Sequence, residues 1–267
     1  MGGNTKALRV RIKSVTSTLA LTKAMGLVAS SKIRRANEGM SNAREYTASL
    51  EKSIALLTSS GECLKSPYMR NSEKQRTKII VIAGDRGMAG GYNANVFRLC
   101  AEFPEAEMIP IGKRACERFG KAVISSEHYS FSQGYELADE LCIQFANEEF
   151  DRLGIIYTKY ISVMSQEAQI RWILPLQKSD ITVGSEVVFE PDHISVLNMT
   201  VREYIAGMLT AYIRESFASE VAARRLAMDS AGKNARQMID NLALEYNRAR
   251  QSTITQEITE IVAGSGD

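Results

Sequence analysis

Acidic side chains are missing from the start of this 267-residue chain, where the first carboxylate is Glu38. Eight basic side chains precede it: Lys6, Arg9, Arg11, Lys13, Lys23, Lys32, Arg34 and Arg35. The net charge of the whole chain is only +2, so the protein as a whole is not a polycation. The local excess predicts a basic N-terminal arm that faces an acidic partner.

Cysteine and histidine are too few and too scattered for a metal or disulfide scaffold. The four cysteines (Cys63, Cys100, Cys116 and Cys142) form no CxxC pair, and the chain has only two histidines. This spacing predicts neither a zinc site nor a disulfide framework and favours a reducing compartment. No apolar stretch approaches the roughly 18 residues of a membrane span, and the N-terminus lacks the apolar core of a signal peptide. We therefore expect a soluble chain that is not exported.

Proline is rare and confined to the middle of the chain, at positions 67, 104, 110, 175 and 191. Because proline interrupts helices, the proline-free ends favour long helices. The sequence predicts three parts: an N-terminal coiled-coil helix over 1–66, a central α/β domain over 67–192, and a C-terminal coiled-coil helix over 193–267.

The proline-free N-terminal segment carries an apolar seam at alternating steps of three and four. This pattern predicts a coiled coil, and the small residues in its middle imply a closely packed partner helix. The seam positions are Ile12, Val15, Leu19, Thr22, Gly26, Ala29, Ile33, Ala36, Met40, Ala43, Thr47, Leu50, Ile54 and Leu57.

The C-terminal segment has a less regular seam, which Arg224 interrupts. Its positions are Phe217, Val221, Met228, Ala231, Ala235, Met238 and Leu242. Past Tyr246 the apolar residues move to Ile254, Ile258, Ile261 and Val262. We expect this helix to extend beyond its partner and to bury that tip in another protein.

The middle of the chain alternates between strand and helix patterns. We predict strands over 78–83, 107–111, 153–160 and 169–174, a hairpin turn over 164–167, and a helix over 135–150. The predicted fold class is therefore α/β: a long antiparallel coiled coil of N- and C-terminal helices with an inserted small Rossmann-like α/β domain.

A glycine-rich turn follows the first strand, with Gly84, Gly87, Gly90 and Gly91 in eight residues. Such a loop can cradle phosphate, but Tyr92 and Asn93 stand where a nucleotide loop needs Lys and Ser or Thr, and the GxGxxG spacing is absent. We favour a structural turn over a cofactor site. In this turn, Asp85 and Arg86 are expected to form a local stabilising pair.

No catalytic constellation is apparent elsewhere in the sequence. His128 and His193 have no neighbouring ligand pattern and are expected on the surface or in loops. No nucleophile, base and acid can be assembled into one site. We predict no catalytic, cofactor-binding or metal-binding residue.

Three stretches together resemble the γ subunit of the bacterial F-type ATP synthase. They are LTKAMGLVASSKIRRA at 21–36, GDRGMAGGYN at 84–93 and YNRARQSTITQEITEIV at 246–262. A further match covers 218–242, and the resemblance is looser in the centre. The family's usual SDRGLCGG reads GDRGMAGG here.

The resemblance implies a non-catalytic subunit with no cofactor and no direct small-molecule substrate. By the family pattern, the chain is the central rotor shaft that couples ion-driven rotation of the membrane c-ring to ATP synthesis or hydrolysis at the β subunits. Its implied partners are the α and β subunits of the catalytic hexamer, the ε subunit and the c-ring. Its implied place is peripheral, on the cytoplasmic face of the bacterial cell membrane.

The resemblance also implies the contact residues. Six residues fall where family members meet the β subunits: Lys23, Met25, Arg250, Gln251, Thr255 and Glu257. The apolar tip (Ile258, Ile261 and Val262) falls in the bearing-like sleeve of the hexamer. Periodicity alone would make Met25 a core residue of the coiled coil, and only the motif match assigns it to an interface.

Two other function classes compete with the rotary subunit. A basic coiled-coil nucleic-acid-binding or scaffold protein would use the arm on phosphates, with steeply salt-dependent affinity. The apolar seam of the arm is already committed to a helix, and no aromatic residues lie among the basic ones. A nucleotide-dependent enzyme would bind ATP or NAD. The glycine spacing argues against this class, because it matches neither nucleotide-binding motif. The rotary subunit accounts for both ends and the inserted domain together.

Overall fold

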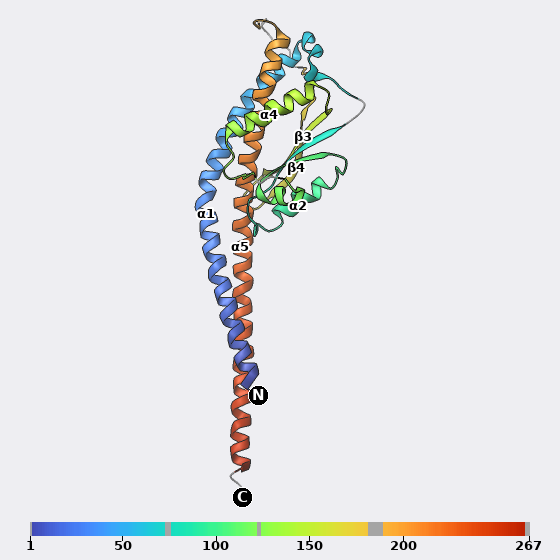
Figure 1. The fold of residues 1–267 in the computed structure, drawn as a ribbon. Coiled ribbons are helices and arrows are strands. Elements are labelled where there is room, and N and C mark those ends of the chain that lie inside the picture. The colour runs from blue at the N-terminus through green and yellow to red at the C-terminus, as the bar shows by residue number, and fades with distance from the viewer. Residues whose placement is uncertain (1, 73–75, 122–123, 181–188, 265–267) are drawn as a thin grey trace. The chain divides into compact units, whose positions relative to one another are not determined.

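The computed structural model describes residues 2–72, 76–121, 124–180 and 189–264. Two compact units make up the chain. The first, called here the two-helix unit, contains residues 1–29 and 225–267, and the second, called the α/β unit, contains residues 30–224. Helices α1 (Gly2–Ser59) and α5 (His193–Gly264) each contribute to both units (Figure 1).

The two-helix unit is an antiparallel pair. Arg9 Nη2 of α1 donates a hydrogen bond to the Tyr246 hydroxyl of α5 at 2.7 Å. Farther along α1, a Cβ placed on Gly26 would lie 3.6 Å from Cβ of Met228. The residue numbers of α5 therefore fall as those of α1 rise, as they do in an antiparallel pair. Every predicted seam position of α1 from Ile12 to Ala29 is buried or half-buried. The predicted coiled coil with close packing at its small residues is confirmed here.

The C-terminal seam was predicted correctly except at one position. Ala235 and Leu242 are buried, but Met238 is 44% exposed. Ile239 is half-buried in its place, because the seam steps by four and then three from Ala235 to Leu242. The prediction of Met238 as a seam residue is wrong, since a step of three there leaves the side chain on the outer face.

The α/β unit contains a four-stranded sheet in the order β2-β1-β3-β4. Strand β1 (Thr77–Ile82) lies parallel to β2 (Glu107–Ile111) and to β3 (Arg152–Tyr160), whereas β4 (Gln166–Leu174) is antiparallel to β3. Three parallel strands with an antiparallel edge fit the predicted small α/β domain. All four predicted strands are present.

The hairpin between β3 and β4 turns earlier than predicted. β4 already begins at Gln166, and the amide of Ile161 donates to the Ser165 carbonyl at 3.2 Å. The predicted turn over 164–167 is therefore wrong by about three residues. Ser162 stabilises the actual turn, because its side chain accepts bonds from the amides of Met164 and Ser165.

Helices cover both faces of the sheet. Ile79 and Val81 of β1 pack with α2 (Tyr92–Cys100) and α3 (Lys113–Phe119), while Ile80 and Ile82 pack with α4 (Phe131–Ala146) and with the α1 and α5 segments of this unit. Successive side chains of a strand point to opposite faces, so an unbroken run of β-branched residues fills both layers. Two short 3-10 helices, Gly61–Lys65 and Pro67–Met69, connect α1 to the sheet.

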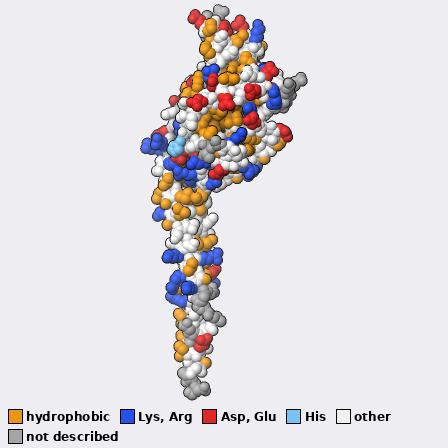
Figure 2. Space-filling view, viewed as in Figure 1, with side chains coloured by type: hydrophobic (Ala, Val, Ile, Leu, Met, Phe, Trp, Pro, Cys, Tyr) orange, Lys and Arg blue, Asp and Glu red, His pale blue; other side chains and the backbone are white. Residues whose placement is uncertain are grey.

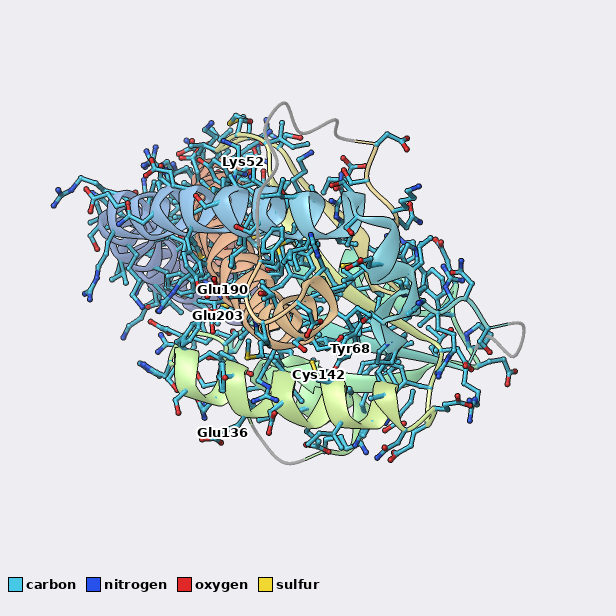
Figure 3. The ribbon with its side chains drawn as sticks, turned by 90° about the horizontal axis from the view of Figure 1, so that it is seen from above. Lys52, Tyr68, Glu136, Cys142, Glu190 and Glu203 are labelled. Carbon is cyan, nitrogen blue, oxygen red and sulfur yellow. The ribbon has the colours of Figure 1, made fainter. Side chains whose placement is uncertain are left out.

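The helix predicted over 135–150 is α4, which spans Phe131–Ala146. It therefore begins and ends four residues earlier than predicted. Ser130 caps its N-terminus: its hydroxyl accepts from the Gln133 amide, and Gln133 returns a bond to the Ser130 amide. Glu148 has φ 61°, which ends helical backbone at this point. Leu141 and Phe145 are buried on the face of α4 that packs against the sheet. Figure 3 shows Cys142 of this helix near Tyr68.

The α1 and α5 segments of the α/β unit also run antiparallel and approach closely. A Cβ on Gly207 would lie 2.3 Å from Cδ1 of Leu50 and 3.0 Å from Cε1 of Tyr46, so a larger residue there would require these side chains to move. The predicted seam positions of α1 from Ile33 to Leu57 are all buried or half-buried. The seam thus serves two purposes, since here it also closes one layer of the α/β unit.

Candidate subunit interface

The glycine-rich loop after β1 is packed against a buried carboxylate of α5. A Cβ on Gly84 would lie 2.8 Å from Cδ and 2.9 Å from Oε1 of Glu220, whose side chain is only 5% exposed. Arg224 forms an ion pair with Glu220, and its Nη2 also donates to the Gly87 carbonyl at 3.3 Å. Burial raises the pKa of the Glu220 carboxyl, and Arg224 opposes that rise. Arg224, which interrupts the apolar seam, thus holds the loop.

Further hydrogen bonds join the same parts of the α/β unit. The Tyr92 hydroxyl donates to the Ser216 carbonyl at 3.1 Å, and Ser216 Oγ accepts from the amide of Thr158 at 3.0 Å. Ser219 Oγ donates to the Thr158 carbonyl at 3.0 Å. The polar residues of the stretch ESFASE at 215–220 therefore serve as attachment points for β3 and the loop.

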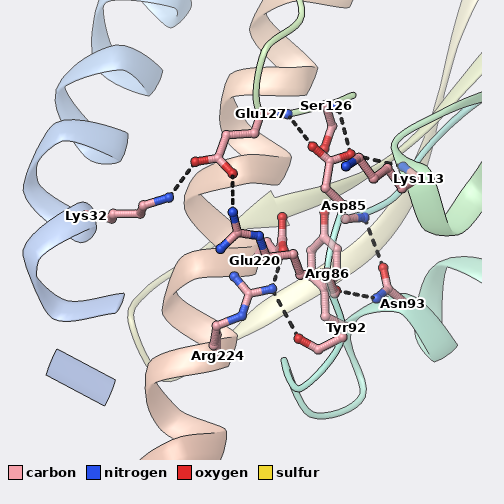
Figure 4. Close-up of polar contacts among 12 residues, drawn as sticks. Lys32, Asp85, Arg86, Tyr92, Asn93, Lys113, Ser126, Glu127, Glu220 and Arg224 are labelled. Carbon is pink, nitrogen blue, oxygen red and sulfur yellow. Dashed lines mark hydrogen bonds and ion pairs between the residues drawn. The ribbon is translucent and has the colours of Figure 1, made fainter. Parts of the chain in front are cut away.

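Asp85 does not pair with Arg86 as predicted. Its carboxylate instead accepts hydrogen bonds from the amides of Lys113, Ser126 and Glu127, each at 3.0 Å, and from the Ser125 hydroxyl at 2.5 Å (Figure 4). Burial alone would raise the pKa of Asp85, but these four donors outweigh it and lower the pKa. The prediction is wrong because free amides at the start of α3 and in the 125–127 loop are better partners than an exposed guanidinium.

Arg86 instead faces Glu127, with Nη2 4.0 Å from Oε2. Glu127 also forms an ion pair with Lys32 of α1 (Figure 4), and the Lys32 contact lowers the pKa of its carboxyl. Asn93 Oδ1 accepts from the Gly84 amide at 3.0 Å. The Gly84 amide is thus engaged within the chain, and the buried Glu220 carboxylate beside the loop repels an anion. These contacts support the structural turn over the cofactor site.

The predicted β-contact residues form two separate groups on the two-helix unit. The first group lies on α1, where Lys23 is exposed and Met25 is half-buried. Their neighbour Thr22 packs against Gly232 of α5, which marks the level of this group along the helix pair. Arg250, Gln251 and Thr255 are exposed on α5, beyond the position of the Arg9–Tyr246 contact. At 1.5 Å per residue, the roughly 20 residues between the groups correspond to about 30 Å of helix. The structure does not bring the groups together.

The apolar tip of α5 is exposed within the two-helix unit. Ile258, Ile261 and Val262 are 56%, 70% and 65% exposed, and Ile254 is 45% exposed. Four exposed apolar side chains at one helix end are typical of a surface that another protein covers. The backbone of Glu257 is helical, but its side chain lies outside the described residues. Thr255 uses its hydroxyl internally, donating to the Gln251 carbonyl at 2.9 Å.

The two-helix unit is strongly basic apart from its tip. Residues 2–29 and 225–250 contain ten Lys and Arg residues against three acidic residues, Asp229, Asp240 and Glu245. Figure 2 shows Lys and Arg side chains interspersed with hydrophobic ones along this unit. The predicted basic arm therefore includes the facing segment of α5, which the sequence analysis did not anticipate.

Three exposed apolar side chains accompany Lys23 and were also missed. Leu21, Leu27 and Val28 are 56%, 64% and 55% exposed. Their positions outside the apolar seam were a signal in the sequence, because a residue off the seam of a two-helix pair faces outward. Exposed apolar side chains near exposed basic ones indicate a surface that another protein covers.

Neither a metal-ligand cluster nor a membrane span is found in the part of the chain that the structure describes. In residues 2–72, 76–121, 124–180 and 189–264, no three His, Cys, Asp or Glu side chains gather as metal ligands. Among the same residues, no helix is both long and apolar enough to cross a membrane.

Comparison with known structures defines the class through the fold. The chain resembles a chain of the Euglena gracilis mitochondrial ATP synthase, solved as OSCP/F1/c-ring, with a TM-score of 0.71 and 18% identity over 99% of this chain and 94% of that one. It also resembles a chain of the Tetrahymena thermophila mitochondrial ATP synthase central stalk and c-ring, with a TM-score of 0.61 and 20% identity over 79% of this chain and 99% of that one. The shared fold is a helix pair carrying a small α/β domain.

Sequence comparison identifies the family. The ATP synthase family profile matches residues 4–266. The ATP synthase gamma chain of Ruminococcus albus is 40% identical over 98% of both chains. The sodium-ion-specific gamma chain of Acetobacterium woodii is 34% identical over 99% of both. This chain belongs to the ATP synthase gamma chain family, and it is a non-catalytic subunit of that complex.

Proposed function

We propose that this chain is the central shaft of a rotary ATP synthase, turned by an ion-driven c-ring and turning within a hexamer of α and β subunits. One observation carries the proposal: the two-helix unit is basic on its outer face and ends in an exposed apolar tip, Ile258, Ile261 and Val262. Both features suit a helix pair enclosed by larger partners.

The basic residues suit a rotor because exposed ion pairs are weak. An exposed pair contributes about 0 to 1 kcal/mol, so many such contacts with an acidic ring guide orientation without fixing one position. Lys23 and Arg250 are exposed and have no ion-pair partner among the described residues. We assign both to contacts with the β subunits.

The two contact groups have distinct roles in this proposal. Lys23 and Met25 would meet β subunits on one level, and Arg250, Gln251, Thr255 and Glu257 on another, about 30 Å away along the helices. The apolar tip would turn in a sleeve formed by the hexamer. The α/β unit would contact the ε subunit and the c-ring. The division into 1–66, 67–192 and 193–267 is our proposal for how these tasks are distributed.

The complex would hold the chain peripherally at the cytoplasmic face of a bacterial membrane. Native mass spectrometry of the complex that a tagged full chain extracts from gently solubilised membranes tests the proposal. We expect one copy of this chain with three copies each of two larger nucleotide-binding subunits. A homo-oligomer, or a complex with nucleic acid, would contradict it and favour the basic scaffold or nucleic-acid-binding alternative.

A further inference from the structure

A recess in the α/β unit gathers basic side chains from separate segments, including Lys32 and Arg35 of the predicted basic arm. Its volume is about 550 Å³, within the range of roughly 300 to 1,000 Å³ that is typical of small-molecule sites. Three segments line it: α1 around Lys32 and Arg35, the loop at Glu127 and His128, and α5 at Arg214 and Phe217. Figure 2 shows Lys and Arg side chains gathered around a histidine on this face.

Both acidic residues of the recess are already neutralised. Glu127 pairs with Lys32 and also faces Arg86, and Glu38 pairs with Arg34 at 3.3 Å. Arg35 and Arg214 are exposed and have no ion-pair or hydrogen-bond partner among the described residues. The recess therefore keeps two uncompensated guanidinium groups from two different helices.

The elements that present these groups are firmly held. The Lys32–Glu127 ion pair joins α1 to the loop, and the loop amides of Ser126 and Glu127 are bonded to Asp85. Phe217 packs with Ala36, Met40 and Ala218 between α1 and α5. A ligand would meet a site that is already shaped, which lowers the ordering cost of binding.

We propose that this recess binds a phosphate-bearing anion. Guanidinium groups match phosphate oxygens in geometry and charge, and a phosphate monoester carries close to two negative charges at neutral pH, which equals the two uncompensated cations. The imidazole of His128 adds a further donor. Inorganic phosphate, pyrophosphate and the phosphates of a nucleotide share this chemistry.

The recess favours a small anion over an acidic protein segment because it is concave and bounded on three sides. This site is separate from the glycine loop, none of whose residues lines the recess. It also does not depend on the proposed shaft contacts, which lie in the two-helix unit.

Isothermal titration of the purified full chain tests the proposal, with inorganic phosphate, pyrophosphate and ADP as separate probes at matched ionic strength. We expect saturable 1:1 binding of at least one probe. Arg35→Gln and Arg214→Gln should each weaken it by about tenfold, because each removes a charge-assisted hydrogen bond. The order of the three affinities identifies the source of the phosphate group.

Arg98→Gln is the control, since Arg98 is exposed on α2, does not line the recess and pairs with neither of its acidic residues. It should leave the affinity unchanged. Circular dichroism of all three variants should match the parent, because the substituted side chains are exposed. No saturable binding of any probe, or equal weakening by all three variants, would overturn the proposal. Binding of a poly-glutamate peptide in place of the phosphates would also overturn it.

Discussion

Gly84 is the position where the smallest substitution most directly tests the buried Glu220–Arg224 ion pair of the α/β unit. A Cβ there would lie 2.8 Å from Cδ of Glu220, about 0.6 Å short of the 3.4 Å at which ordinary contact begins. The backbone at Gly84 is not in the left-handed region, so Gly84→Ala acts through this contact alone. The carboxylate must then move away from Arg224, its ion-pair partner.

The expected cost follows from the burial of the pair. Separating a buried ion pair typically costs about 3 to 5 kcal/mol, and partial relaxation should reduce this to about 2 to 3 kcal/mol for Gly84→Ala. Urea unfolding followed by fluorescence measures it. Trp172 is the only tryptophan and lies on β4, so the signal reports on the α/β unit rather than on the two-helix unit.

A double-mutant cycle separates this contact from other effects. Glu220→Ala removes the atoms that the added Cβ would meet, so Gly84→Ala in that background should cost less than about 1 kcal/mol. Gly91→Ala is the matched control in the same loop: its Cβ would lie 3.7 Å from the nearest atom, and we expect a change within about 0.5 kcal/mol. A coupling energy near zero between positions 84 and 220 would refute the reasoning.

Three further predictions concern charge and the two-helix unit. Asp151 accepts bonds from Arg76, which lower its pKa to about 2, so its contribution to stability is present above about pH 4 and is lost as the pH falls towards 2. Asp151→Asn should therefore lower the free energy of unfolding at about pH 6, and its difference from the parent should shrink between about pH 4 and 2 in urea titrations; a constant difference would contradict this. Joint Ile258→Asp and Ile261→Asp should prevent assembly with the α and β subunits in native mass spectrometry, whereas Leu at both positions should preserve it, because isolated buried charge is costly. Undiminished assembly of the Asp variant would disprove the role of the tip. Joint Lys23→Gln and Arg250→Gln should reduce the ATP made per ion transported while leaving the melting temperature of the isolated chain unchanged, since both residues are exposed; a collapse of that temperature would make them structural.

The elements of this fold could be predicted from local patterns, but their exact limits could not. The apolar residues that recur at alternating steps of three and four predicted the helix pair. This pattern depends only on which side of each helix is buried, which is a local property of the sequence. The limits depended on single polar contacts. Ser130 starts α4 through its reciprocal bonds with Gln133, and Ser162 closes the hairpin turn. Many serines neither cap a helix nor close a turn, so the sequence alone did not single out these two residues.

The contacts between distant segments were beyond prediction for a different reason. Arg224 was visible as an interruption of the seam, but nothing in the sequence joined it and its neighbour Glu220 to Gly87, more than a hundred residues away. Asp85 was assigned to its neighbour Arg86 because sequence analysis weighs adjacent partners first. The structure supplies backbone amides from the 125–127 loop instead. The recess around Arg35 and Arg214 depends equally on the meeting of separate elements.

The buried polar contacts of α5 give the glycine-rich loop a structural role. An apolar contact between the loop and α5 would tolerate sliding, because hydrophobic contacts have no direction. Glu220, Arg224 and Ser216 instead impose hydrogen bonds of defined direction on the loop and on β3. The Glu220 carboxylate fits only against a residue without a side chain, which Gly84 provides. A subunit that transmits torque between a ring and a helix pair requires a domain fixed in one orientation on its helix. A buried ion pair with directed hydrogen bonds provides that orientation at the cost of desolvating two charges.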